Sequence, residues 1–191
     1  IDDMPKDKEF YHDIRFFESE FGGIMPLEIL VNTNEPKAVM ELSTLKKIEK
    51  LNETIDEIPE LSTPVSVVNL VKYSKQAFYS GLPKYYQLPT NQDKNYILRY
   101  AKNSSSSTNM LESFVDSTGQ YARITTYMKD VGTTKMEGIE ERLQARIDNV
   151  FKGDKYDVSL TGKALIFLKG TKYLINNLVL SLSLAVLLIA L

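Results

Sequence analysis

The sequence predicts an α+β fold of the ferredoxin-like kind, a sandwich in which one sheet carries both helices on the same face. The order strand–helix–strand occurs twice, in residues 26–71 and again in residues 113–163, and each helix has an apolar face that would cover the sheet. Residues 72–112 differ in composition and form an expected insertion between these βαβ halves, rich in aromatic residues and partly helical. Residues 1–25 are a polar lead-in, and residues 164–191 predict an apolar C-terminal helix.

The first half is defined by breaks in the pattern. The lead-in ends at Phe21-Gly22-Gly23, where paired glycines favour the backbone angles of a turn. Residues 26–31 (PLEILV) form an apolar run typical of a strand. Residues 37–58 predict an amphipathic helix, and Pro59 ends it because proline cannot continue the backbone hydrogen bonds. Residues 62–71 (STPVSVVNLV) are rich in β-branched side chains and predict a second strand.

The second half repeats this order. Residues 121–128 (YARITTYM) alternate in polarity like a half-buried strand. Residues 133–151 predict a second amphipathic helix with apolar side chains at steps of three and four. Residues 156–162 (YDVSLTG) alternate again and predict the last strand of the sheet.

The insertion carries the best candidate for a ligand surface. Residues 72–89 are dense in Tyr and Phe, residues 91–102 predict a short helix, and residues 103–109 (NSSSSTN) predict a loop of small residues. Tyr and Phe offer a large apolar area with a polar tip, which suits lipids and other amphiphiles. The alternative is that these side chains pack the insertion onto the core. The predicted contact residues are Phe78, Tyr79, Tyr85, Tyr86 and Leu88.

The C-terminal segment has the composition of a membrane-spanning helix. No charged residue occurs from Tyr173 to Leu191, and a helix of that length spans roughly 28 Å, close to the hydrocarbon thickness of a bilayer. A buried core helix is the alternative, and it is favoured by the polar residues Asn176, Asn177, Ser181 and Ser183. Residues 184–191 are apolar on every face, which favours the membrane. Because the chain also begins at Ile1, we expect it to be a piece of a larger membrane protein, with one water-exposed domain and the start of a transmembrane helix.

Composition excludes several classes of function. The chain has 191 residues and a formal net charge of −2, with no stripe of Lys and Arg that would indicate nucleic-acid binding. Cysteine is absent, which rules out disulfides, thiol nucleophiles and thiolate metal sites. No signal peptide is visible at the start, as expected if an earlier membrane helix directs translocation.

Signals for catalysis or metal binding are weak. His12 is the only histidine and lies in a polar segment, so we expect a solvated side chain there. A serine hydrolase would need a G-x-S-x-G motif, which the sequence lacks. Thr161-Gly162-Lys163-Ala164 lacks the upstream glycine and the following Ser or Thr of a phosphate loop. We therefore expect a protein that is not an enzyme and that uses no cofactor and no metal.

Three further patterns have structural explanations. A cluster of charges at helical spacing predicts a salt-bridged solvent face. Its members are Glu137, Glu140, Glu141, Arg142 and Arg146. Asp116 and Arg123 flank a predicted turn, where an ion pair between them would be structural. Asn52-Glu53-Thr54 matches the glycosylation sequence, which has meaning only in a eukaryotic secretory protein.

Several short motifs, taken in order, resemble the extracytoplasmic loop of the RND superfamily, and the MMPL and Patched-like exporters in particular. In the first half they are Phe16-Phe17, Phe21-Gly22-Gly23 and Pro26-Leu27-Glu28-Ile29, followed by strand–helix–strand. In the second half they are Asp116, Gly119-Gln120-Tyr121-Ala122-Arg123-Ile124, an amphipathic helix, and Thr161-Gly162 directly before the membrane helix. The resemblance covers nearly the whole chain in the order of its elements.

This resemblance implies a polytopic transporter with two such loops, each of them a porter domain built from ferredoxin-like subdomains. Hydrophobic or lipid-like cargo would pass between these subdomains, driven by proton or ion flux through charged residues in membrane helices that lie outside this chain. The implied location is the bacterial inner membrane, with the domain facing the periplasm. The implied partners are the cargo, the membrane, the remainder of the transporter chain and further copies of it in a homo-oligomer, but no nucleic acid.

One observation opposes this orientation, and one other class of function stays open. Lys163, Lys169 and Lys172 lie on the near side of the apolar segment, which the positive-inside rule would place in the cytoplasm. Long domains translocate largely regardless of charge, so the external orientation is kept. The other class is a membrane-anchored domain that docks proteins in the envelope or assists translocation without transport.

Overall fold

A three-stranded antiparallel sheet organises the computed structural model, which describes residues 5–103, 110–153 and 155–190. Its strands are β1 (Met25–Asn32), β2 (Tyr121–Met128) and β3 (Asp157–Thr161), in the order β2-β1-β3. In this register Ile29 of β1 faces Ile124 of β2 and Leu160 of β3. All three strands fall where the sequence predicts them, and the chain is a mixed α+β protein.

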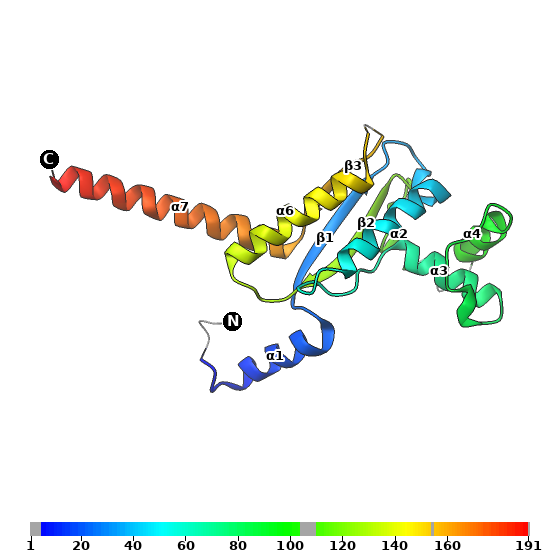
Figure 1. Ribbon diagram of the computed structural model, residues 1–191, viewed down its shortest axis with the longest axis horizontal. Helices are drawn as coiled ribbons and strands as arrows, with labels where there is room; N and C mark the ends of the chain where they lie inside the picture. Colours follow the sequence, from blue (N-terminus) through cyan, green and yellow to red (C-terminus); the bar gives the residue numbers. More distant parts are fainter. Residues whose placement is uncertain (1–4, 104–109, 154, 191) are drawn as a thin grey trace.

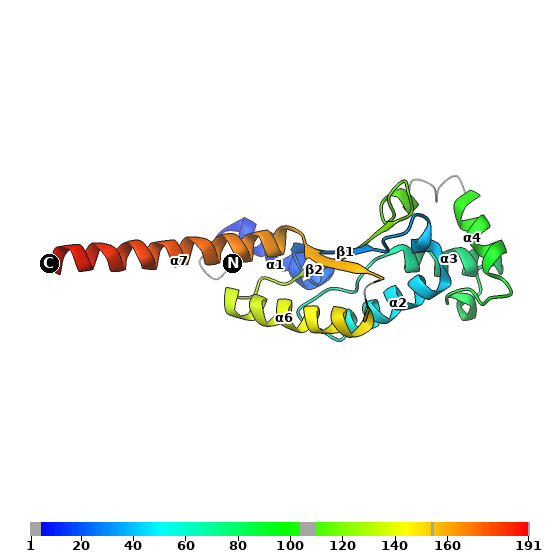
Figure 2. The ribbon, with the colours of Figure 1, turned by 90° about the horizontal axis from the view of Figure 1, so that it is seen from above.

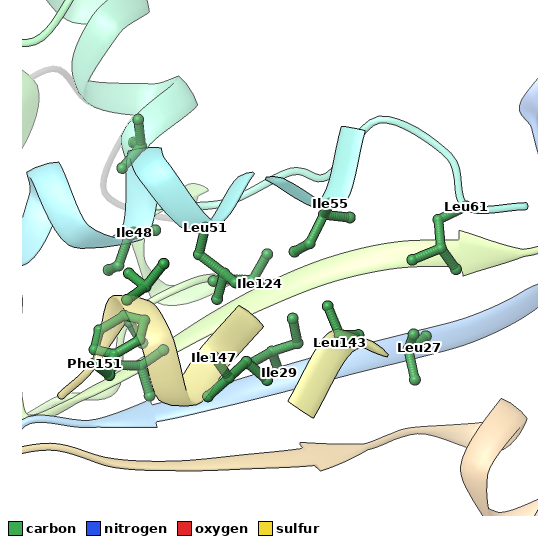
Figure 3. Packing of buried hydrophobic residues seen from close by; sticks show 14 of the residues in the cluster. Leu27, Ile29, Ile48, Leu51, Ile55, Leu61, Ile124, Leu143, Ile147 and Phe151 are labelled. Carbon is green, nitrogen blue, oxygen red and sulfur yellow. The ribbon is translucent and has the colours of Figure 1, made fainter. Parts of the chain in front are cut away.

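Two helices cover one face of the sheet: α2 (Leu42–Asp56) and α6 (Thr133–Val150). Buried and accessible residues alternate along β2, so one face meets the helices while Tyr121 and Tyr127 remain exposed on the other. Figure 3 shows the core that results, between the sheet and the two helices. Each fully buried Leu or Ile contributes about 1.5–3 kcal/mol relative to exposure. The side chains labelled there include Leu27, Ile29, Ile48, Leu51, Ile55, Ile124, Leu143, Ile147 and Phe151.

The predicted strand at residues 62–71 is wrong. Only Leu61 and Val65 form isolated bridges, to Met128 and Thr125 of β2, and the chain then enters helix α3 (Val67–Phe78). Ser66 caps this helix: its Oγ accepts a hydrogen bond from the backbone N–H of Val68 at 3.2 Å, and the Asn69 side chain accepts one from the backbone N–H of Ser66 at 2.9 Å. The capping box and the burial of the valines on a helical face outweigh their β propensity.

The insertion packs as a small helical unit at one end of the body. It contains most of α3, the 3-10 turn η2 (Pro83–Tyr85) and α4 (Lys94–Asn103), with α4 against α3. Its predicted short helix is confirmed as α4. The predicted loop of small residues falls mostly at 104–109, outside the described residues.

The ends of the chain form two helices, α1 (Glu9–Phe21) and α7 (Lys163–Ala190). Another 3-10 turn, η1 (Ala38–Met40), precedes α2, so the helix predicted from residue 37 begins only at Leu42. Only the first turns of α7 are buried, at Ala164, Leu165 and Leu168. Beyond them the helix projects away from the body and is exposed (Figure 1), so it is not part of the core of this domain. Among the described residues, α7 is the one helix long and apolar enough to cross a membrane.

Candidate functional site

Four aromatic rings meet on the insertion, and we call them the aromatic tip: Phe78, Tyr79, Tyr85 and Tyr100. The rings of Tyr79 and Tyr85 stack with centroids 4.3 Å apart, and the Phe78 ring meets those of Tyr79 and Tyr100 edge-on at 5.2 and 5.7 Å. The aromatic tip lies at the end of the body opposite α7 (Figure 1). It is therefore the part of the domain farthest from the apolar helix.

A tight turn after α3 brings these rings together. Ser80 and Gly81 both adopt left-handed backbone angles, with φ of +60° and +77°. The backbone N–H of Gly81 donates to the carbonyl of Gln76 at 2.8 Å, and the Gln76 side chain donates back to the carbonyl of Gly81 at 2.9 Å. Pro83 then starts η2, which places Tyr85 on Tyr79. The left-handed turn at Ser80 and Gly81 thus brings the two stacked rings together.

A buried ion pair fixes the position of α4 beside α3. The Lys75 side chain is only 3% exposed, and its Nζ lies 3.1 Å from Oδ2 of Asp93. The same Nζ donates to the carbonyl of Leu88 at 3.2 Å. Burial opposes ionisation of Asp93, but hydrogen bonds from Thr90 and Lys75 outweigh it and hold the pKa of this carboxyl below its usual range. Lys75 and Asp93 therefore clamp the two helices that carry the rings.

The insertion is basic although the whole chain is slightly acidic. Residues 72–112 contain six Lys or Arg and two Asp or Glu, a net charge of +4 against −2 for the whole chain. Two of the lysines lie over aromatic rings: Lys84 Nζ is 5.0 Å from the centre of the Tyr85 ring, and Lys72 Nζ is 5.8 Å from that of Tyr86. Lys72 also pairs with Glu49 of α2 at 2.5 Å. The surface thus combines apolar rings with positive charge.

The structure separates the five predicted contact residues into three groups. Phe78, Tyr79 and Tyr85 lie together in the aromatic tip. Tyr86 stands apart under Lys72 and is 44% exposed, close to the 45% of Phe78. Leu88 is half-buried and packs against the core. Packing thus accounts for Leu88, whereas Phe78 and Tyr86 present accessible rings.

A second apolar surface lies at the other end of the body, on α1, and sequence analysis missed it. Four side chains recur at steps of four, three and four residues, which places them on one face of the helix. They are Phe10, Ile14, Phe17 and Phe21. The rings of Phe17 and Phe21 stack at 5.4 Å and line a hollow of about 370 Å³ together with Gly23, Ile24 and Tyr127. The helical spacing in the lead-in is the signal that would have found it.

Polar contacts and two glycines hold α1 in place. The buried carboxylate of Glu18 accepts the backbone N–H of Asp130 at 2.7 Å and pairs with Arg15 at 2.7 Å. Gly22 ends the helix with φ of +74°. A Cβ on Gly23 would lie 2.7 Å from the carbonyl carbon of Met128, so only glycine allows this approach to β2. The Phe21-Gly22-Gly23 motif thus fixes the position of the Phe21 ring.

The remaining patterns have structural roles. The Asn52 side chain donates to Oγ of Ser66 at 2.9 Å, so this amide belongs to the contact between α2 and the cap of α3. Gly162 adopts φ of +103° where a Cβ would lie 2.7 Å from the carbonyl oxygen of Pro26, so it is a close-packed turn. His12 is exposed. In the described part of the chain, no cluster of three or more His, Asp or Glu side chains could hold a metal ion.

Two predicted ionic contacts need correction. Asp116 does not pair with Arg123; its carboxylate accepts the backbone N–H groups of Gln120 and Tyr121, both at 2.8 Å, because it caps the turn before β2. Arg123 instead donates to the carbonyl of Ser113. The charges of α6 do not pair with one another as predicted but reach other elements. The observed pairs are Glu137–Lys172, Glu140–Lys169, Arg142–Glu60 and Arg146–Glu57.

No protein-family model matches the sequence, and no curated protein matches it significantly.

Proposed function

We propose that this chain is the periplasmic porter domain of an RND-type exporter of lipid-like or hydrophobic compounds, located in the bacterial inner membrane. Ion or proton flux through membrane helices outside the chain would drive the exporter. The observation that carries the proposal is the exit of α7: β3 ends at Thr161, and the helix begins at Lys163 with only Gly162 between them. A helix long and apolar enough to span a membrane thus continues directly from the sheet.

The order of the β segments supports a ferredoxin-like porter subdomain. In that fold the second strand, which closes the first half, lies at the sheet edge beside the strand that opens the second half. Here Leu61 and Val65 occupy this position through their bridges to β2. The edge strand is thus represented by two isolated bridges, and the other three strands have the order β2-β1-β3 expected from two βαβ halves.

Contacts at the start of α7 give the transporter a way to couple its membrane helix to the domain. Gly162 packs against the backbone of β1, and Leu168 is the last buried residue of the helix. Lys169 then lies 3.4 Å from Glu140 of α6, and Lys172 pairs with Glu137 one turn earlier in α6. A tilt of α7 would therefore be passed to both the sheet and α6.

The aromatic tip supplies the contact surface for hydrophobic cargo in this proposal. Its rings offer apolar area, and the Lys84 ammonium over the Tyr85 ring can donate hydrogen bonds to a polar headgroup. Such a surface binds and releases without chemical conversion, so the proposed protein is a transporter and not an enzyme.

The test uses the natural protein that contains this chain, reconstituted in vesicles with a fluorescent lipid and an imposed proton gradient. We expect gradient-dependent lipid movement, slowed about tenfold by Phe78→Ser with Tyr85→Ser, because each ring removed takes away apolar contact. Tyr73→Ser is the matched control, since Tyr73 is 65% exposed on α3 but lies outside the aromatic tip. Movement that ignores the gradient would contradict the exporter.

A membrane-anchored docking domain without transport is the second candidate. The exposure of Tyr73 and Tyr96 on the insertion favours it, because Tyr is enriched at protein interfaces. Under this alternative the same vesicles would show no lipid movement, and the tip variants would instead release a protein partner.

A further inference from the structure

The apolar face of α1 formed by Phe10, Ile14, Phe17 and Phe21, which we call the stripe, is held in place by contacts of other residues. Glu18 and Gly23 anchor the helix, as described above, while Phe10, Phe17 and Phe21 stay exposed. The polar and backbone contacts of α1 thus come from Glu18 and Gly23, and about half of the surface of each ring is left accessible. An apolar surface that is fixed in position and left uncovered indicates a ligand or partner.

The hollow beside the stripe has the lining and the size for an alkyl chain. Phe17, Phe21 and Ile24 supply apolar walls, and Tyr127 from the open face of the sheet closes the far side. Ligand pockets in proteins measure roughly 300–1,000 Å³. At about 370 Å³ this hollow lies at the low end of that range, which suits one chain and not a whole lipid.

The hollow also lies on the membrane side of the domain. The start of α7 packs against the start of β1, which α1 enters, so both helices leave the same end of the sheet (Figures 1 and 2). From Lys163 to Lys172 the helix rises ~15 Å before its uncharged segment begins. One leaflet of the hydrocarbon core is also about 15 Å thick, so an alkyl chain can reach from the bilayer surface to the hollow.

The charges around the stripe restrict the headgroup. The α1 helix carries four carboxylates and one arginine, and Arg15 is already paired with Glu18. The net negative charge of α1 itself thus favours a neutral or zwitterionic headgroup over an anionic one, even with Lys8 at its start and Lys129 beside it.

We propose that the hollow between α1 and β2 binds one alkyl chain of a neutral or zwitterionic lipid drawn out of the adjacent leaflet. The proposal rests on the membrane attachment in the proposed function, but not on transport. It assigns to Phe17 and Phe21 a lipid-binding role, separate from the cargo contact proposed for the aromatic tip.

The absence of tryptophan from the chain allows a direct test. Phe21→Trp places a single reporter in the hollow, and the protein is inserted into phosphatidylcholine nanodiscs with or without bromine atoms on the acyl chains. We expect the brominated chains to quench this tryptophan. With Phe17→Ser added, about ten times more brominated lipid should be required for half-maximal quenching, since an apolar wall of the hollow is lost.

Matched variants separate the hollow from general contact with the bilayer. Phe16→Ser should leave the quenching unchanged, because Phe16 is 59% exposed, much like Phe17 at 54%, but does not line the hollow. Tyr96→Trp at the far end should stay unquenched, and Tyr173→Trp on α7 should be quenched strongly. Equal loss with Phe16→Ser, stronger quenching in brominated phosphatidylglycerol, or no quenching at position 21 would each overturn the proposal.

Two further outcomes are distinct. If position 173 is also unquenched, α7 is not in the bilayer and the proposed function fails with the inference. If Phe21→Trp gives a blue-shifted emission that depends on protein concentration and ignores bromine, a second copy covers the stripe and the lipid proposal is overturned.

Discussion

Loss of the ion pair between Lys75 and Asp93 should destabilise the packing of α4 more than the loss of any surface ion pair of the insertion does. Asp93→Ala leaves the Lys75 ammonium buried with only the Leu88 carbonyl as acceptor. Removing one partner of a buried pair costs about 3 kcal/mol, because the remaining charge is desolvated and uncompensated. Replacing both with apolar residues, as in Lys75→Met with Asp93→Leu, should recover most of that loss.

The assay is urea unfolding of the protein in detergent micelles, combined with hydrogen exchange of the amides of α4. The matched control is Glu49→Ala, which removes the partner of Lys72 in a pair that is more exposed, and it should cost about 1 kcal/mol or less. If Asp93→Ala costs no more than Glu49→Ala, or if the double variant is as unstable as the single one, the clamp does not hold α4.

Three further predictions concern pH, backbone approach and the exit of α7. Folding lowers the pKa of both Asp93 and Asp116. Burial opposes ionisation of each carboxyl, but hydrogen bonds outweigh it: from Thr90 and Lys75 at Asp93, and from Thr118 and the backbone at Asp116. Both carboxylates therefore stabilise the fold at pH above their unfolded pKa of about 3.9, and the stability should fall as the pH drops through their lower folded pKa values. A melting temperature that does not change from pH 5 to well below about 3.9 would contradict this. Gly23→Ala should cost about 2 kcal/mol in urea unfolding because its Cβ meets the Met128 backbone, whereas Gly138→Ala, with open space on a helix, should stabilise by about 1 kcal/mol; equal effects would show that the approach is not tight. Lys172→Glu should free α7 from α6, and the swap with Glu137→Lys should restore the contact, as read from the distance between spin labels on the two helices; a distance unchanged by Lys172→Glu would refute the coupling.

The sheet and its two covering helices could be predicted from the sequence because each has one buried face. The alternation in residues 121–128 and the helical spacing in residues 133–151 survive unchanged as β2 and α6. In long elements the burial of one face determines the secondary structure, and this burial is visible in the sequence as a regular spacing of apolar residues.

The error at residues 62–71 came from weighting β-branched composition over a local capping signal. Ser66 and Asn69 stand three residues apart, and together they start α3. The valines that indicate a strand then fall on the buried face of a helix. The β-branched composition favours a strand and the capping box favours a helix, and packing of the valines in the core stabilises the helix.

The candidate site was only partly predictable. The density of aromatic residues pointed to the insertion, but stacking of Tyr79 on Tyr85 depends on the left-handed turn at Ser80 and Gly81. The inward position of Leu88 depends on the long-range clamp at Lys75. Neither the turn nor the clamp produces a periodic pattern in the sequence, so neither could be predicted from spacing.

The most direct test of the central claim is the accessibility of α4, at the same end of the domain as the aromatic tip, in spheroplasts. The chain contains no cysteine, so Tyr96→Cys adds a label site to the natural protein, and the unchanged natural protein labelled in parallel is the control. With α7 spanning the inner membrane and the domain in the periplasm, a membrane-impermeant maleimide should label this cysteine in intact spheroplasts. Labelling only after the membrane is permeabilised, or recovery of the protein in the soluble fraction, would contradict the account.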